Sequence, residues 1–174
     1  MTTQVMLDLE TLGTKPGSVI VAIGAVKFRD GEILSEYYER IDPRSCVDAG
    51  LKVDVGTVMW WMRQDNAARL EIAKGGEPLK DVLEAFDNWI VNPEVEVWGN
   101  GVGFDNALLS AAYDAVKMDC PWEFYNDRCY RTLKNLYPQV GITRSGTHHN
   151  ALDDARDQAI HLMKILDLIY GTKK

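Results

Sequence analysis

The sequence predicts an α/β fold built on a mixed sheet flanked by helices. Two observations carry this prediction. Three strand-like segments follow one another near the N-terminus, and short strands then alternate with amphipathic helices along the rest of the chain. The length of 174 residues suits one domain with a sizeable apolar core, so we expect residues 1–174 to form a single domain.

The first three strands are predicted from apolar runs separated by turn residues. Residues 4–9 and 18–28 are rich in valine, leucine and isoleucine, and the segment 13–17 between them carries glycine and proline. An Asp-Gly pair at residues 30–31 is a hairpin signal that leads into a third strand over residues 33–41. We therefore expect three antiparallel strands at the start of the domain.

The remainder of the chain is predicted to form helices and short, parallel strands. A helix over residues 57–74 is expected to begin with Thr57 as its N-cap. Residues 79–91 and 150–170 carry apolar side chains at helical spacing. Shorter elements complete the prediction: strands at residues 95–98 and 127–130, and helices at residues 104–117 and 132–137.

Charge and composition restrict the classes of partner. The formal net charge of −7 argues against a nonspecific nucleic-acid binder with a basic face. Acids that hold divalent cations would reverse this argument locally, because the cations attract phosphate. No apolar run approaches the roughly 20 residues of a membrane span, and no secretory signal is recognisable. We therefore expect a cytoplasmic protein without membrane contact, with its three cysteines reduced.

Three acids lie where predicted elements begin or end. Asp8 and Glu10 are two residues apart on the first strand, so their side chains leave the same face. A solvated strand end would explain such a pair, but the segment is otherwise apolar, and buried acids need a counter-charge. Asp105 begins the helix predicted after Phe104, where the helix dipole alone would also favour an acid.

A fourth acid and a histidine open the last predicted helix. We expect Asn150 at its N-cap and His149 on the loop before it. Asp153 is then expected to cap the helix, so Asp154 is the acid that we expect to bind a metal ion. His148 is a competing histidine, and a plain exposed loop residue remains the alternative for His149. Four acids and a histidine predict a hydrolytic metal site, because Mg²⁺ prefers oxygen ligands.

In chain order, these motifs resemble the three exonuclease motifs of the DEDDh family: Asp8-x-Glu10, Phe104-Asp105 and His149-x-x-x-x-Asp154. This family comprises 3′–5′ exonucleases with a ribonuclease H-like fold, including ribonuclease T and oligoribonuclease. Within it, the chain is most similar to phage and prophage exonuclease VIII-like proteins and to a mycobacterial exoribonuclease-like group. That closer similarity rests on residues 6–13, residues 21–26 and the pair Trp60-Trp61.

The resemblance implies a two-metal site. Two Mg²⁺ or Mn²⁺ ions would be held by four carboxylates: Asp8, Glu10, Asp105 and Asp154. His149 would act as the general base, since an unperturbed histidine has a pKa near 6.5. The implied reaction releases nucleoside 5′-monophosphates from the 3′ end of single-stranded or 3′-overhanging RNA or DNA. The resemblance also implies that the protein can form a homodimer. Its implied location is the cytoplasm of a bacterial host or of a phage-infected cell.

The resemblance also implies contacts to the substrate. Thr11 and Leu12 would line the terminal nucleotide, and Phe104 would stack on a base. Trp60, Trp61 and Arg63 are further candidates, with packing of the double tryptophan as the alternative. Two other functions stay open from the sequence: a catalytically silent nucleic-acid-binding module on the same fold, and a phosphoesterase acting on small nucleotides.

Overall fold

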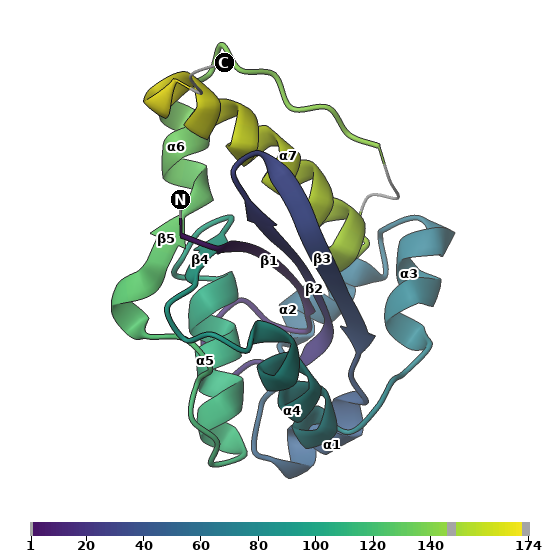
Figure 1. The fold of residues 1–174 in the computed structure, drawn as a ribbon. Coiled ribbons are helices and arrows are strands. Elements are labelled where there is room, and N and C mark those ends of the chain that lie inside the picture. The colour runs from purple at the N-terminus through teal and green to yellow at the C-terminus, as the bar shows by residue number, and fades with distance from the viewer. Residues whose placement is uncertain (1, 146–148, 172–174) are drawn as a thin grey trace.

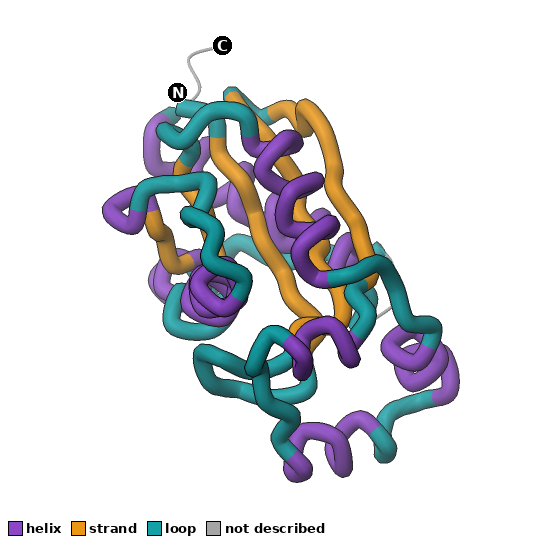
Figure 2. The backbone as a smooth tube through the Cα atoms, turned by 90° about the horizontal axis from the view of Figure 1, so that it is seen from below, coloured by secondary structure: helices purple, strands orange, loops and turns teal. Residues whose placement is uncertain are grey.

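The computed structural model describes residues 2–145 and 149–171, and its centre is a mixed sheet. Five strands lie in the order β3-β2-β1-β4-β5. Figure 1 shows the sheet crossed by α7 on one side, and Figure 2 shows helices on both sides of the strands. The predicted α/β class with a mixed sheet is confirmed.

The strands have two orientations, as the sequence predicts. β1 (Gln4–Thr11), β2 (Ile20–Arg29) and β3 (Glu32–Arg40) form an antiparallel meander. β4 (Glu96–Gly99) runs parallel to β1, and β5 (Asp127–Cys129) runs parallel to β4. Because β1 and β4 are parallel neighbours, their carboxyl ends meet at one edge of the sheet, which is where ligands bind in many α/β folds.

Alternation along β1 separates two apolar layers. Val5, Leu7 and Leu9 pack into a core with α1 (Pro43–Asp48), α4 (Leu79–Ile90) and α5 (Asp105–Ala115). Met6 faces the other way, into a second core beneath α6 (Tyr130–Leu136) and α7 (Ala151–Tyr170). Asp8 and Glu10 share the parity of Met6, so the strand directs them to the α7 side.

The predicted helix over residues 57–74 is wrong, because the chain forms two short helices there. α2 (Val55–Trp61) begins after Asp54, whose carboxylate accepts from the backbone N–H of Thr57. Thr57 is therefore not the N-cap. α3 (Asn66–Ala73) begins after Asp65, which caps it in the same manner. Each aspartate satisfies free backbone donors and so starts a helix of its own.

The helix α1 was not predicted, although the sequence contains its signal. Asp42 caps it, and Pro43 occupies its first turn, where the missing N–H costs nothing. Cys46 of α1 is buried, and all three cysteines, Cys46, Cys120 and Cys129, are free thiols. Within the described residues, no helix is long and apolar enough to cross a membrane.

A glycine brings the start of α7 onto the sheet. Gly24 on β2 is the cross-strand partner of Asp8. A Cβ at Gly24 would lie 2.1 Å from the carbonyl carbon of Ala151, the first residue of α7. Only a residue without a side chain permits this approach. The close contact sets the N-terminus of α7 beside the acids of β1.

Candidate active site

The acids of β1 face the first two turns of α7. The side-chain amide of Gln158 on α7 donates to Oδ1 of Asp8 at 2.7 Å. Glu10 is only 7% exposed. One carboxylate oxygen of Glu10, one of Asp154 and one ring nitrogen of His149 all lie within 4.8 Å of one another. The strand end and the helix start therefore converge on one small volume.

Asp105 joins this cluster from the carboxyl end of β4. Its side chain is 3% exposed and accepts from the backbone N–H of Leu9 at 3.2 Å and of Asn100 at 3.0 Å. Gly99 makes room for it, because a Cβ there would lie 3.1 Å from the Cβ of Asp105 and 2.3 Å from Oδ1 of Asn106. Two backbone donors thus hold the buried carboxylate in a fixed orientation.

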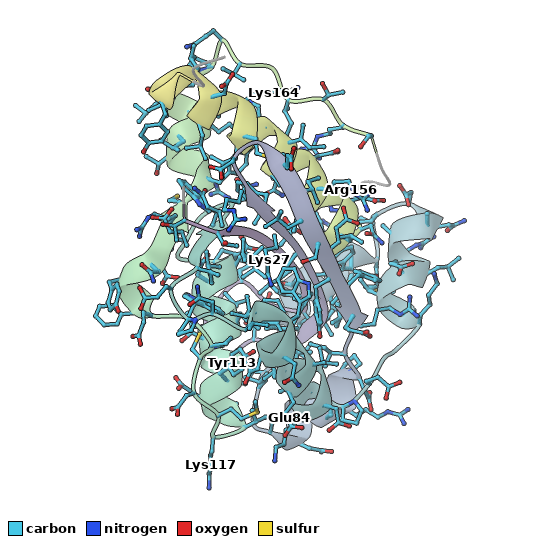
Figure 3. The ribbon with its side chains drawn as sticks, viewed as in Figure 1. Lys27, Glu84, Tyr113, Lys117, Arg156 and Lys164 are labelled. Carbon is cyan, nitrogen blue, oxygen red and sulfur yellow. The ribbon has the colours of Figure 1, made fainter. Side chains whose placement is uncertain are left out.

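The cap of α7 forms as predicted. Asn150 is the N-cap, and its side chain accepts from the backbone N–H of Leu152 and of Asp153, each at 3.1 Å. The carboxylate of Asp153 pairs with Arg156 at 2.9 Å, and Arg156 in turn pairs with Glu36 on β3 at 2.7 Å. Figure 3 shows Arg156 on α7 beside β3. Asp153 therefore ties the helix to the sheet edge.

His149 is oriented by its backbone and by two indole rings. It has a φ of 65°, and its N–H donates to Oδ2 of Asp154 at 3.2 Å. The centroids of the Trp60 and Trp61 rings lie 5.2 and 5.6 Å from that of His149, both edge-to-face. Two ring contacts thus restrict the imidazole, and the hydrogen bond from the backbone N–H of His149 fixes the main chain beside Asp154. The competing His148 lies outside the described residues.

Burial makes the metal-free cluster hold protons. Burial, with repulsion from Asp154 and Asp105, raises the pKa of Glu10 to about 8. Burial also raises the pKa of Asp105 to about 7, although the N–H donors of Leu9 and Asn100 oppose the rise. The pKa of Asp8 is raised well above its ordinary range by burial and then by the neighbouring acids. A cation that replaced these protons would relieve the mutual repulsion.

The donor set suits a hard divalent cation. Four carboxylates provide oxygen ligands, which Mg²⁺ and Mn²⁺ prefer, and three of the acids are destabilised as anions in the absence of positive charge. One imidazole lies within reach of the same point. The residues present therefore fit a divalent metal centre.

A cavity of about 410 Å³ adjoins the acids on the side of α2. Its lining includes Glu10 and four of the predicted substrate residues: Thr11, Trp60, Trp61 and Phe104. The remaining lining was not predicted: Leu9, Thr14, Asp54, Gly56 and Thr57. Apolar walls with a few polar groups are typical of a site for a small ligand or a nucleobase.

The structure separates the other predicted substrate residues from this cavity. Leu12 packs against the core of the α4 and α5 side and is not part of the lining. Arg63 follows the end of α2 with an exposed side chain and is also absent from the lining. Trp61 is 3% exposed and its indole N–H donates to the carbonyl of Thr11 at 2.8 Å, so packing accounts for most of its surface.

Two polar neighbours of the acids were missed. Gln158 stands four residues after Asp154 on α7, and this helical spacing could have identified it. Arg144 pairs with Oδ1 of Asp154 at 3.0 Å from a segment without regular structure, and no pattern in the sequence signals that contact.

Comparison with known sequences identifies a family and a relative of this chain. The family model of the 3′-5′ exoribonuclease Rv2179c-like domain matches residues 3–166. The PolC-type DNA polymerase III of Thermotoga petrophila is 27% identical over 180 residues, which cover 96% of this chain and 12% of the polymerase. This chain thus spans about one eighth of that relative's length.

Two solved structures share the fold. The zinc-bound form of the E. coli ExoI–ssDNA complex superposes with a TM-score of 0.69 at 15% identity, covering 99% of this chain and 42% of the other. The nuclease domain of 3′hExo, a DEDDh family member bound to rAMP, superposes with a TM-score of 0.62 at 14% identity, covering 97% and 92%.

The fold, the order of the motifs and the family match lead to one assignment. The mixed sheet of five strands is that of the DEDDh nucleases, and the resemblance seen in the sequence is confirmed. The family model extends over nearly the whole chain. The chain belongs to the family of the Rv2179c-like 3′-5′ exoribonuclease domains.

Proposed function

We propose that this protein removes nucleoside 5′-monophosphates from the 3′ end of single-stranded nucleic acid with the help of divalent metal ions. The observation that carries the proposal is the meeting of Glu10, His149 and Asp154 within 4.8 Å, next to the buried carboxylates of Asp8 and Asp105. Acids in such numbers destabilise the fold unless they bind cations, so a functional reason is required for them.

The four acids are the proposed ligands: Asp8, Glu10, Asp105 and Asp154. Divalent cations, when bound there, supply Lewis-acid stabilisation to the attacking and leaving oxygens of a phosphodiester. Gln158 orients Asp8 through its 2.7 Å hydrogen bond, and the backbone donors at Leu9 and Asn100 orient Asp105. Ligands held in this manner need little reorganisation when substrate arrives.

His149 is the proposed general base. It would take a proton from the water that attacks phosphorus, while the bond to the 3′-oxygen breaks and that oxygen takes up a proton from solvent. The products are a nucleoside 5′-monophosphate and a strand shortened by one nucleotide. Trp60 and Trp61 hold the ring beside Asp154, which supports this assignment.

The cavity beside Glu10 is the proposed place for the terminal nucleotide. Phe104 and Trp60 offer ring surfaces there, and stacking on an aromatic side chain contributes about 1–3 kcal/mol per base in single-strand binders. Trp60 remains 44% exposed, so it has surface to offer to a base.

The test is digestion of a 5′-labelled single-stranded oligonucleotide by the wild type, Asp8→Ala and His149→Ala, each with Mg²⁺ and with Mn²⁺. Loss of a positioned base lowers the rate by about 10²–10⁴-fold, and loss of Asp8 is expected to cost at least as much. A ladder shortening from the 3′ end is the expected product. Wild-type rates in either variant would contradict the site assignment.

Matched RNA and DNA strands should be digested side by side. The family model is that of an exoribonuclease, which supports RNA as the preferred substrate. Binding of strands without metal-dependent turnover would instead support a silent binding module. Hydrolysis of a chromogenic monoester, but of no oligonucleotide, would support a small-nucleotide phosphoesterase.

A further inference from the structure

Three basic side chains lie near one another on and beside α6, and two of them reach the acid site. Arg131 and Lys134 are one turn apart on α6, and Arg144 lies on the segment that leads towards α7. We call Arg131, Lys134 and Arg144 the basic strip. It is notable in a chain with 26 acidic and 19 basic residues, because the average surface charge of this protein repels phosphate.

The strip reaches the acids at two points. Arg131 donates from Nη2 to the carbonyl of Asn100, in the loop that precedes Asp105. Arg144 pairs with Asp154 at 3.0 Å. One arginine thus contacts the loop before α5, and the other contacts the first turn of α7.

Lys134 lies on a rigid support. Its Nζ is 5.4 Å from the centroid of the Tyr130 ring, in a cation–π contact. The hydroxyl of Tyr130 bonds Nδ1 of His161 at 2.7 Å, and Nε2 of His161 bonds the carbonyl of Val140 at 2.7 Å. Buried polar partners therefore fix the platform on which the ammonium rests.

The cations of the strip are close enough to repel one another. Burial, followed by repulsion from Arg131 and Arg144, lowers the pKa of Lys134. Arg131 also lies in the first turn of α6, where the helix dipole disfavours a cation by about 0.3–1 kcal/mol. Among the described residues, no carboxylate lies within ion-pair distance of Arg131 or Lys134, although the charge of Arg131 opposes the rise that burial causes in the pKa of Asp105. A bound anion would offset these costs.

We propose that the basic strip binds the phosphodiester backbone of the incoming strand, upstream of the bond that is cut. The inference rests on the proposed function, because it takes the acids as the place of cleavage. The terminal nucleotide would occupy the aromatic cavity, the scissile phosphate would lie at the acids, and the preceding phosphates would follow α6. Arg144 already pairs with Asp154, so the test relies on Arg131 and Lys134.

The experiment measures binding of a phosphorothioate-linked octanucleotide, which resists hydrolysis, by fluorescence anisotropy between 50 and 200 mM salt. Arg131→Gln/Lys134→Gln removes two cations. The slope of log K against log salt should become less steep by about 1.4, since each phosphate contact to a single strand contributes about 0.7. The Kd at 50 mM salt should rise by about tenfold or more.

The matched control removes the same charge elsewhere. Lys117 and Lys164 are exposed, and Figure 3 shows them at opposite extremes of the molecule. Lys117→Gln/Lys164→Gln should keep the wild-type slope. Arg131→Lys keeps the charge but loses the planar guanidinium, so it should also keep most of the slope if phosphate binding is the role. Equal slopes in the strip variant and the control would overturn the proposal.

Kinetics separate this inference from the proposed function. In the strip variant, KM for the natural octanucleotide should rise with little change in kcat, and the loss should shrink as the substrate shortens towards a dinucleotide. A wild-type protein that hydrolyses no oligonucleotide would refute the proposed function alone, while the salt slopes would still decide the binding strip. A loss that is equal at all substrate lengths would count against the strip.

Discussion

β1 and α7 face each other along their length, but the two ends of this contact differ in chemistry. At one end, Met6 packs beneath Leu162 and Leu166 in an apolar core. At the other end, Asp8 meets Gln158, and Glu10 meets Asp154. One strand and one helix can therefore form both an apolar core and a reactive site, provided that the charge at the acidic end is neutralised.

The difference also predicts opposite responses to mutation. At the apolar end, removed atoms leave a cavity and the fold loses stability. At the acidic end, removed charge relieves repulsion, so the metal-free fold should gain stability while activity disappears. Four predictions test this contrast.

The largest expected effect is on catalysis, in Glu10→Gln. Loss of a proposed ligand removes several kcal/mol of charge stabilisation, which corresponds to at least about a thousandfold in kcat/KM. In EDTA the variant should unfold at the same or a higher temperature than the wild type, because burial and neighbouring acids disfavour the Glu10 anion. Oligonucleotide digestion and thermal melts measure the two quantities. A variant that is both active and destabilised would reverse the contrast.

The second expected effect is on stability, in Leu162→Ala. Its side chain is fully buried in the core beneath α7, so truncation should cost about 2–5 kcal/mol of unfolding free energy. Urea denaturation measures this loss. Activity per folded molecule should remain near that of the wild type at low temperature, since the acids lie at the other end of the helix. A large fall in kcat with the fold intact would contradict the separation of the two ends.

The third prediction concerns Gly24, which sets the distance between β2 and the start of α7. Gly24→Ala should cost about 1–3 kcal/mol, because the new Cβ overlaps the backbone of Ala151 and α7 must shift. His149 and Asp154 would shift with it, so kcat/KM should fall as well. The control is Gly141→Ala, where a Cβ meets no atom within 4 Å. Equal effects of the two substitutions would refute the positioning role.

The fourth prediction is a dependence of metal-free stability on pH. The pKa of Glu10 is raised from 4.5 to about 8 by burial, so the folded state binds more protons than the unfolded state between these values. Stability must therefore fall as the pH rises through this window. In EDTA this loss, about 1.4 kcal/mol for each pH unit of the window, should lower the Tm by about 10 °C between pH 5 and pH 9. Saturating Mn²⁺, or Glu10→Gln, should reduce the drop, and an unchanged drop would contradict a metal site here.

Much of the fold follows from local sequence. The apolar runs and the Asp-Gly turn at residues 30–31 identify the meander of β1, β2 and β3, and helical spacing identifies α4 and α7. The wrong prediction of one helix over residues 57–74 is explained by local helix capping. Asp54 and Asp65 divide the predicted helix over residues 57–74, because a side-chain cap outweighs the continuity of an apolar pattern.

The acids and the histidine of the candidate site were predicted from the sequence, but the side chains that contact them were not. Asp8, Glu10 and Asp154 could be named from spacing and from resemblance, since each lies at an element boundary. The ring contacts of His149 with Trp60 and Trp61 join segments almost ninety residues apart, so no local sequence pattern predicts them. The same holds for the contact of Arg144 with Asp154, and for the basic strip.

The sequence by itself determined the α/β class, the four acids with their histidine, and the family to which the chain belongs, because these depend on residue type and order along the chain. The tertiary structure alone decided which groups surround the acids. Gly24 admits the start of α7, Gly99 admits Asp105, and α6 brings its cations to the rim. Such distances are set by packing of elements remote in sequence, and packing is a property of the folded chain.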